Sequence, residues 1–223
     1  MKRLFFLLPM FALLGSCGCQ EEATCPVLTI EGGQIQGVRA DDANSPSQAV
    51  FAFKGIPYAA APIGDLRWRE PQPVVAWDGV RMCDKFGHPG YQAVHYPGFY
   101  ASEWGYGDEA PYSEDCLYLN VWTKAAGQVD RKLPVALWIH GGGYREGWGT
   151  EPEFDGLEWA KKDVVLVTIN YRLGVFGFMT HPELSAESPN HVSGNYGILD
   201  QIQSLRWVKE NIAQLGGDPD NVT

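Results

Sequence analysis

Residues 133–148 read LPVALWIHGGGYREGW, and the interpretation of the whole chain starts from this stretch. An apolar run at residues 135–139 stops at His140. Three glycines follow it: Gly141, Gly142 and Gly143. An apolar run bounded by glycines is typical of a strand buried on both faces, and glycines leave their backbone N–H groups uncovered. Either this is an ordinary strand-to-loop turn, or its N–H groups bind a negatively charged oxygen.

The composition is that of a globular protein and excludes several classes of function. Apolar residues make up 45% of the 223 residues, which is ample material for a core. The formal net charge of −10 argues against nucleic acid as a partner. Glycine-rich nucleotide-binding motifs and the common cysteine and histidine zinc motifs are missing from the sequence, so it implies no metal and no cofactor.

Along the chain, strands are expected first and then strands alternating with helices. Such an order predicts an antiparallel start followed by a largely parallel sheet with flanking helices. The expected strands are a hairpin at residues 27–30 and 34–38, then residues 50–58, 117–122, 135–139 and 164–169. The expected helices are residues 153–162 and a long one at residues 198–215, whose apolar residues recur at helical spacing. The proline-rich residues 62–73 are expected to wrap over the surface.

Two long segments are expected to be irregular. Residues 84–115 contain many aromatic rings, which either pack on the body of the protein or line an apolar pocket. Residues 174–177 form a tight bend and residues 185–193 a polar loop. The serines and histidines of the second segment have no rigid support, so we do not expect a nucleophile there.

The first residues predict an export signal. Lys2 and Arg3 precede the apolar residues 4–14, a run too short to cross a bilayer as a helix. The following Leu-Gly-Ser-Cys resembles a bacterial lipoprotein box, in which Cys17 is lipidated; the alternative is a plain secretory signal. We therefore predict a signal at residues 1–16, a tether at 17–26 and one domain at 27–223. The protein is expected to be exported and held at a membrane only through Cys17, or otherwise periplasmic or secreted.

Export places the remaining cysteines in an oxidising compartment. They are Cys19, Cys25, Cys83 and Cys116. We expect a disulfide between Cys83 and Cys116, although spacing alone does not determine connectivity.

Several further motifs make the chain similar to the type-B carboxylesterase family, which includes cholinesterases and fungal lipases. The resemblance covers about residues 27–223 and adds to HGGG the motifs FKGIPYA, LRWREPQP, EDCLYLNVW, NYRLGVFGF, GNYGILDQ and LRWVKENIAQLGGDPDNVT. It implies the N-terminal part of an α/β-hydrolase fold. It also implies ester hydrolysis through a serine acyl-enzyme, with a small-molecule ester as the substrate.

The resemblance assigns roles to particular residues. Gly142 and Gly143 are expected to donate the N–H groups of an oxyanion hole, while His140 and Gly141 support the turn. Two ion pairs are implied, Arg67 with Glu114 and Arg172 with Asp200; in each case the alternative is a charge that faces solvent. The family usually places its first cysteine near Gly90, so the sequence departs from the pattern at Cys83.

The chain also departs from the family pattern at its end. In the family, GGDPxNVT is followed within a few residues by the G-x-S-x-G nucleophile motif, and here Thr223 is the last residue. The sequence holds part of the oxyanion hole and none of the catalytic triad. We expect an N-terminal portion of a larger esterase that is inactive by itself. The alternative is a non-catalytic, cholinesterase-like binding or adhesion protein.

Overall fold

The structure is a computed structural model that describes residues 24–41, 49–92 and 112–223. The predicted export signal at residues 1–16, the lipidation site Cys17, Cys19 and most of the tether lie outside the described residues, as does much of the ring-rich segment. Within the described part of the chain, no helix is long and apolar enough to cross a membrane.

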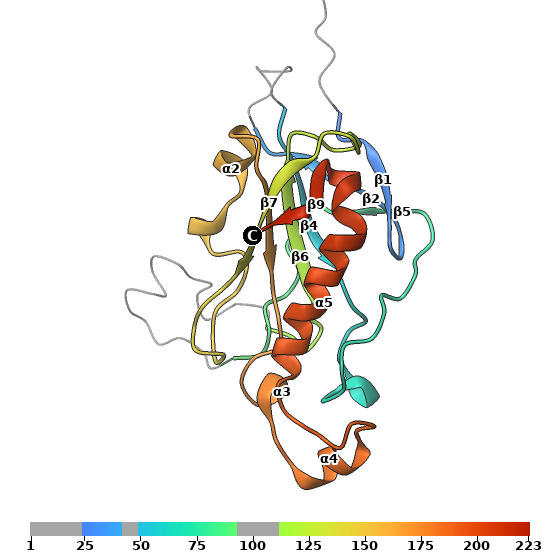
Figure 1. The fold of residues 1–223 in the computed structure, drawn as a ribbon, viewed down its shortest axis with the longest axis vertical. Coiled ribbons are helices and arrows are strands. Elements are labelled where there is room, and N and C mark those ends of the chain that lie inside the picture. Colours follow the sequence, from blue (N-terminus) through green and yellow to red (C-terminus); the bar gives the residue numbers. More distant parts are fainter. Residues whose placement is uncertain (1–23, 42–48, 93–111) are drawn as a thin grey trace, which may run out of the picture.

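A six-stranded sheet forms the centre of the molecule, with strand order β3-β4-β6-β8-β7-β9 (Figure 1). Its strands are β3 (Val38–Arg39), β4 (Phe51–Pro57), β6 (Tyr118–Thr123), β7 (Leu133–Ile139), β8 (Val165–Ile169) and β9 (Gly217–Val222). The pairs from β3 to β8 are antiparallel, whereas β7 is parallel to both β8 and β9. The predicted antiparallel start and parallel continuation are therefore confirmed.

A smaller sheet packs beside the first. It has the order β1-β2-β5, built from β1 (Val27–Ile30), β2 (Gly33–Gln36) and β5 (Val80–Met82). The predicted hairpin is formed by β1 and β2, but the second strand ends at Gln36, and β3 then joins the large sheet. β5 was not expected, because three residues are too few to show a strand pattern.

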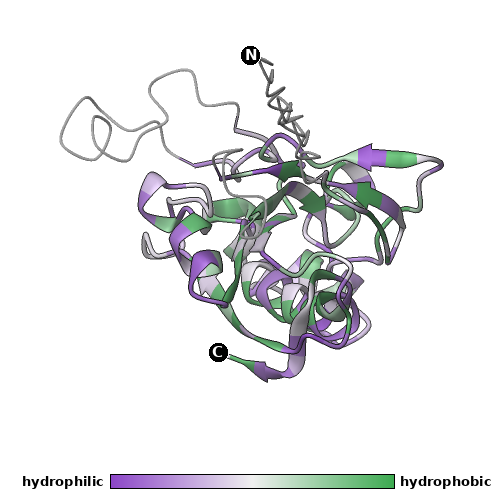
Figure 2. Cartoon of the chain, turned by 90° about the horizontal axis from the view of Figure 1, so that it is seen from above, coloured by the Kyte–Doolittle hydropathy of each residue, from purple (hydrophilic) through white to green (hydrophobic). Residues whose placement is uncertain are grey.

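Different helices cover the two faces of the large sheet: α2 (Leu157–Lys161) lies on one face and α5 (Tyr196–Asn211) on the other. Figure 1 shows α3 (Gly174–Phe178) and α4 (Pro182–Glu187) beyond the lower end of α5. The short 3₁₀ segments are η2 (Gly64–Leu66), η3 (Pro152–Phe154) and η4 (Ile212–Leu215). Successive side chains of a strand point to opposite faces. Val121 accordingly belongs to the cluster that contains α5 residues, and Trp122 to the cluster that contains Ala160 of α2. Figure 2 shows the hydrophobic strands at the centre and hydrophilic stretches on the outer elements.

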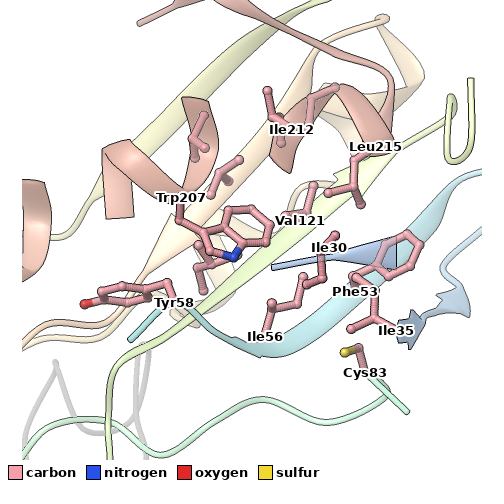
Figure 3. Close-up of a cluster of buried hydrophobic side chains, with 14 of the residues drawn as sticks. Ile30, Ile35, Phe53, Ile56, Tyr58, Cys83, Val121, Trp207, Ile212 and Leu215 are labelled. Atoms are coloured by element: carbon pink, nitrogen blue, oxygen red, sulfur yellow. The ribbon is translucent and has the colours of Figure 1, made fainter. Parts of the chain in front are cut away.

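The main core lies between α5, η4 and the two sheets (Figure 3). Trp207 of α5 and Phe53 of β4 are fully buried in it, together with Ile35 of the smaller sheet. Burial of a large side chain of this kind contributes about 1.5–3 kcal/mol. The two sheets and the long helix therefore form one hydrophobic unit rather than separate domains.

The long helix is present, but its buried face differs from the expected one. Ile202 and Leu205 are 40% and 43% exposed, while Asp200, Ser204 and Trp207 are buried. The expected apolar face is thus confirmed at Val208, Ile212 and Leu215, which are buried. It is wrong at Ile202 and Leu205, because Asp200 counts as polar in any such pattern. The ion pair that Asp200 forms with Arg172 turns this side of the helix toward the sheet.

Three expectations for connecting segments were wrong. The helix expected at residues 153–162 is split into η3 and the five-residue α2. The bend at residues 174–177 is the short helix α3, and part of the expected polar loop is α4, which begins with Pro182. β9 follows Gly216 where the sequence predicted only the end of a helix. Pro219 is compatible with this strand because β9 lies at the sheet edge.

β7 is not buried along its whole length, contrary to the prediction. β9 pairs with Leu133 and Val135 only, and the N–H of Leu137 donates to the Thr223 carbonyl at 2.8 Å. Trp138 and Ile139 remain 39% and 38% exposed. The last two residues of β7, which lead into the glycine turn, therefore have a strand partner on the β8 side and none among the described residues on the other.

Candidate active site

The glycine turn lies at the carboxyl end of β7, where the adjacent parallel strand β8 also ends. Ligands of open α/β sheets bind at this edge. Gly142 and Gly143 have φ angles of +99° and +60°, which other residues rarely adopt. A Cβ atom on Gly142 would lie 2.0 Å from the Glu146 carbonyl oxygen, so the turn requires glycine at this position.

Every carbonyl group that precedes a turn glycine is already hydrogen-bonded. The Tyr171 hydroxyl donates to the His140 carbonyl at 2.9 Å. The Gly141 carbonyl lies 2.9 Å from His140 Nδ1. The Gly142 carbonyl accepts a bond from the backbone N–H of Arg145 at 3.1 Å. The orientations of three consecutive peptide planes are therefore restrained.

Planarity of the peptide then sets the direction of the N–H groups. In a trans peptide the N–H points opposite to the C=O of the preceding residue. The N–H groups of Gly141, Gly142 and Gly143 therefore point away from the contacts that hold these carbonyls. Within the described parts of the chain none of the three amides has a hydrogen-bond acceptor, and all three glycines are exposed. The turn presents unused donors to solvent, an arrangement suited to an anion.

The start of the segment after β8 fastens the turn to the sheet. Asn170 Oδ1 accepts a bond from the Gly149 N–H at 2.7 Å, and the Gly174 N–H donates to the Tyr144 carbonyl at 2.7 Å. On the other side, Gln92 bonds both the N–H and the carbonyl of Gly147, at 2.8 and 3.1 Å. The turn is thus held at its far end as well as at His140.

His140 supports the turn and is unsuited to act as a base. Its side chain is 3% exposed, and its ring stacks on Tyr171 with centroids 4.4 Å apart. Because a carbonyl oxygen only accepts hydrogen bonds, the contact with Gly141 requires the proton on Nδ1. Burial lowers the pKa of His140 to about 4, so the ring is neutral at pH 7. Nε2 has no partner among the described residues.

The structure brings both predicted ion pairs together. Arg172 Nε and Nη2 donate to the two carboxylate oxygens of Asp200 at 2.8 and 2.7 Å, and both side chains are buried. Arg67 Nη2 donates to Glu114 Oε1 at 2.6 Å, and its Nε bonds the other oxygen. Arg172 also donates to the Arg69 carbonyl at 2.8 Å, so one guanidinium joins α5, the end of β8 and the proline-rich segment.

The predicted disulfide between Cys83 and Cys116 is wrong, because both residues are buried free thiols. Cys83 follows β5 and belongs to the apolar cluster around Ile35, where burial raises the pKa of its thiol to about 12 (Figure 3). Cys116 lies opposite Gly90: a Cβ atom built on Gly90 would be 3.5 Å from Cys116 Sγ. The position that faces Cys116 is thus occupied by glycine.

The segment with several serines does not form a second site. The hydroxyls of Ser185 and Ser193 lie 2.7 Å apart, and each donates to the His181 carbonyl. His181 Nδ1 accepts a bond from the Glu183 N–H, so it caps α4. These serines therefore face a backbone carbonyl, and neither faces a base.

A hollow that is open to solvent lies beside the turn. It is lined by Tyr91, Gln92, Arg145, Glu146, Gly174, Val175 and Phe176. Phe176 and Tyr91 pack against each other with centroids 5.5 Å apart. An apolar wall with a few polar groups, next to free N–H donors, is the arrangement expected of a small-molecule site. The described residues include no cluster of side chains that would bind a metal ion.

Asn170, Tyr171 and Gln92 were not singled out from the sequence. Their roles depend on contacts with residues far away along the chain, such as the bond from Tyr171 to His140. Asn170 and Tyr171 directly follow the apolar β8, and a polar residue at the carboxyl end of a buried strand was the one available signal.

The mixed sheet with flanking helices and a glycine turn after a central strand is the N-terminal part of an α/β-hydrolase fold. The chain belongs to the carboxylesterase family, whose sequence model matches residues 24–223.

Individual relatives agree with this assignment. The chain is 46% identical over 196 residues to the fumonisin B1 esterase of Sphingopyxis macrogoltabida, covering 86% of this chain and 33% of that protein. It is 40% identical over 201 residues to the para-nitrobenzyl esterase of Bacillus subtilis (strain 168), covering 90% and 37%. The crystal structure of Geobacillus stearothermophilus carboxylesterase EST55 at pH 6.8 matches with a TM-score of 0.72 and 44% identity, covering 88% and 37%. The chain spans about a third of the length of these relatives.

Proposed function

We propose that this chain is the oxyanion-binding part of a serine carboxylesterase. The observation that carries the proposal is the set of uncovered amides at Gly142 and Gly143, whose peptide planes are restrained by bonds to the preceding carbonyls. Such donors stabilise the negative oxygen of a tetrahedral intermediate, and loss of one donor typically costs about 10²–10³ in rate. The names of the relatives, two of which are esterases, support an ester as the substrate.

The nucleophile is proposed to come from residues that follow β9. β9 runs parallel to β7 with Val222 beside Val135, and β7 continues to Ile139. Since paired parallel strands advance together, an extension of β9 by about four residues would reach the level of the glycine turn. In α/β hydrolases the serine sits on the sharp turn after such a strand. Such an extension would pair with Trp138 and Ile139, which have no strand partner on this side among the described residues.

In the proposed reaction the serine attacks the ester carbonyl, and the resulting oxyanion accepts hydrogen bonds from Gly142 and Gly143. The hollow beside Phe176 then holds one of the two substituents of the ester. His140 remains neutral and holds the Gly141 carbonyl, so the proton of the serine must go to another base supplied, like the serine, by a longer chain. Residues 1–223 alone are therefore proposed to be inactive.

Comparison of two proteins tests this proposal: the 223-residue chain and a longer product of the same gene. The longer protein is expected to hydrolyse para-nitrophenyl acetate and to lose that activity when the serine of its G-x-S-x-G motif is replaced by alanine. Turnover by the purified 223-residue chain would contradict the proposal. A glycine or alanine codon at the serine position of this motif would also contradict the proposal and would favour a binding protein.

We further propose that the protein is exported and lipidated at Cys17, on the basis of residues 1–17 alone. Labelling of expressing bacteria with radioactive palmitate is expected to mark the wild type and to leave Cys17→Ser unlabelled. Equal labelling of the two proteins, or none in either, would reject the lipid anchor.

A further inference from the structure

Tyr171 makes two contacts with His140, and the proposed function does not account for either. Its hydroxyl donates to the His140 carbonyl at 2.9 Å, and its ring lies against the imidazole with an interplanar angle of 18°. Tyr171 is 1% exposed and lies two residues after the end of β8, so its own position is fixed by the sheet. One side chain thus holds both the backbone and the ring of the residue that precedes the glycines.

Each contact restrains a different peptide group. The hydroxyl fixes the carbonyl of His140, and the N–H of Gly141 must therefore point the opposite way. The stacked ring keeps His140 Nδ1 2.9 Å from the Gly141 carbonyl, which directs the N–H of Gly142 in the same manner. The directions of two amides thus depend on Tyr171, one through its hydroxyl and one through its ring.

The glycines themselves contribute little to holding this geometry. They carry no side chain, and glycine loses more conformational freedom on ordering than any other residue. A Cβ built on Gly141 would meet no atom within 4 Å, so packing does not restrain the peptide that joins it to His140. Without the two contacts to Tyr171, this peptide could rotate.

We propose that Tyr171 is a positioning residue that, through His140, orients the amides of Gly141 and Gly142, the second of which is proposed to bind the oxyanion. The expected effect on catalysis rests on the proposed function, whereas the expected effect on the direction of the amides does not. The hydroxyl and the ring have separable effects: Tyr171→Phe removes the bond to the His140 carbonyl and keeps the stack. The control is Tyr118→Phe, which also removes a tyrosine hydroxyl bond, a partly buried one to Asp115 at 3.0 Å, outside the turn.

The structural consequence is tested on the 223-residue chain by NMR, with residual dipolar couplings of selectively ¹⁵N-labelled glycines. In Tyr171→Phe the couplings of Gly141 are expected to change, while those of Gly149, which is held by Asn170, fit the wild-type structure. Tyr118→Phe is expected to leave the couplings of both glycines as in the wild type. Unchanged Gly141 couplings in folded Tyr171→Phe would overturn the proposal.

The catalytic consequence is tested on the longer protein that contains the serine. Tyr171→Phe is expected to lower kcat by about 10²-fold with little change in KM, because rotation of the freed His140–Gly141 peptide displaces the Gly142 amide that follows it, and displaced groups impair transition-state binding more than substrate binding. Tyr118→Phe is expected to retain wild-type kcat. A wild-type protein without activity would reject the proposed function and leave the NMR result to decide the positioning role. An active Tyr171→Phe enzyme with wild-type kcat would reject the positioning role and leave the proposed function intact.

A second pair of variants applies if Tyr171→Phe does not fold. His140→Asn and His140→Ala both remove the stacked ring, but only asparagine retains an N–H donor near the place of Nδ1. The asparagine variant is expected to keep at least about tenfold more kcat than the alanine variant, since one retained hydrogen bond corresponds to about this factor. Equal kcat values in the two variants would show that the Gly141 carbonyl needs no donor, and the proposal would fail.

Discussion

Arg172 and Asp200 form a bidentate ion pair in the interior, with side chains 3% and 0% exposed. Arg172 follows β8, and Asp200 lies in the second turn of α5. The backbone N–H of Arg172 also donates to the same carboxylate at 3.1 Å. This pair therefore connects the long helix to the strand end from which Asn170 and Tyr171 hold the glycine turn.

Replacement of Asp200 by alanine is expected to destabilise the protein by about 3–5 kcal/mol, because it leaves the buried Arg172 without its counter-charge. Urea denaturation measures the change in the free energy of unfolding. Glu158→Ala is the control, since its ion pair with Lys161 lies on the surface, with Glu158 70% exposed; its effect is expected to stay below about 1 kcal/mol. Similar losses of unfolding free energy in the two variants would show that burial of the Arg172–Asp200 pair does not increase its effect on stability.

Alanine substitutions at neighbouring glycines should have very different effects. Gly142→Ala forces a side chain into a φ of +99° and against the Glu146 carbonyl. It is expected to cost about 1–3 kcal/mol through backbone strain, and more if the clash is not relieved. At Gly141 the added methyl group would meet no atom within 4 Å, and the change is expected to be within about 0.5 kcal/mol. Thermal unfolding of the two variants provides the comparison, and equal melting temperatures would refute the turn geometry.

The buried imidazole of His140 predicts a loss of stability in mild acid. Burial lowers the pKa of His140 to about 4, against 6.5 for an exposed histidine. Between these values the unfolded chain binds the proton and the folded protein does not, so stability falls as the pH drops from 6.5 toward 4. A shift of this size corresponds to about 3 kcal/mol.

Urea denaturation of the wild type and His140→Asn over this pH range isolates the contribution of His140. Asparagine does not titrate, so the difference in unfolding free energy between the two proteins is expected to shift in favour of the variant as the pH falls. A difference that is constant with pH would show that His140 titrates like an exposed histidine.

A cysteine at position 90 should form a disulfide with Cys116. The Cβ of Gly90→Cys would lie 3.5 Å from Cys116 Sγ, and a small shift would relieve the approach to the Tyr171 carbonyl at 3.1 Å. Closing a loop of this length is expected to stabilise the oxidised protein by about 3–4 kcal/mol in the chain-entropy model. Thiol titration of the denatured, unreduced protein should detect two fewer free thiols than Gly79→Cys, whose new cysteine has open space around it. The same thiol count in both variants would exclude the bond.

Much of the fold could be predicted from local patterns. The apolar residues of β4, β6 and β8 and the HGGG turn after β7 are visible in the sequence, because buried strands need continuous apolar residues and sharp turns need glycine. The same patterns misjudged α5, where Ile202 and Leu205 face solvent and Asp200 faces the core. Periodicity counts apolar side chains and does not register a buried ion pair.

The sequence by itself determined the family, the position of the glycine turn and the identity of the paired charges. Only the tertiary structure decided how the amides of that turn are directed, through Tyr171 and His140, and that Cys116 faces Gly90 rather than Cys83. The physical reason is the range of the interactions. Turn conformation and strand formation depend on adjacent residues. The hydrogen bonds that orient the amides, and the contact between Cys116 and Gly90, instead join segments that only the folded sheet brings together.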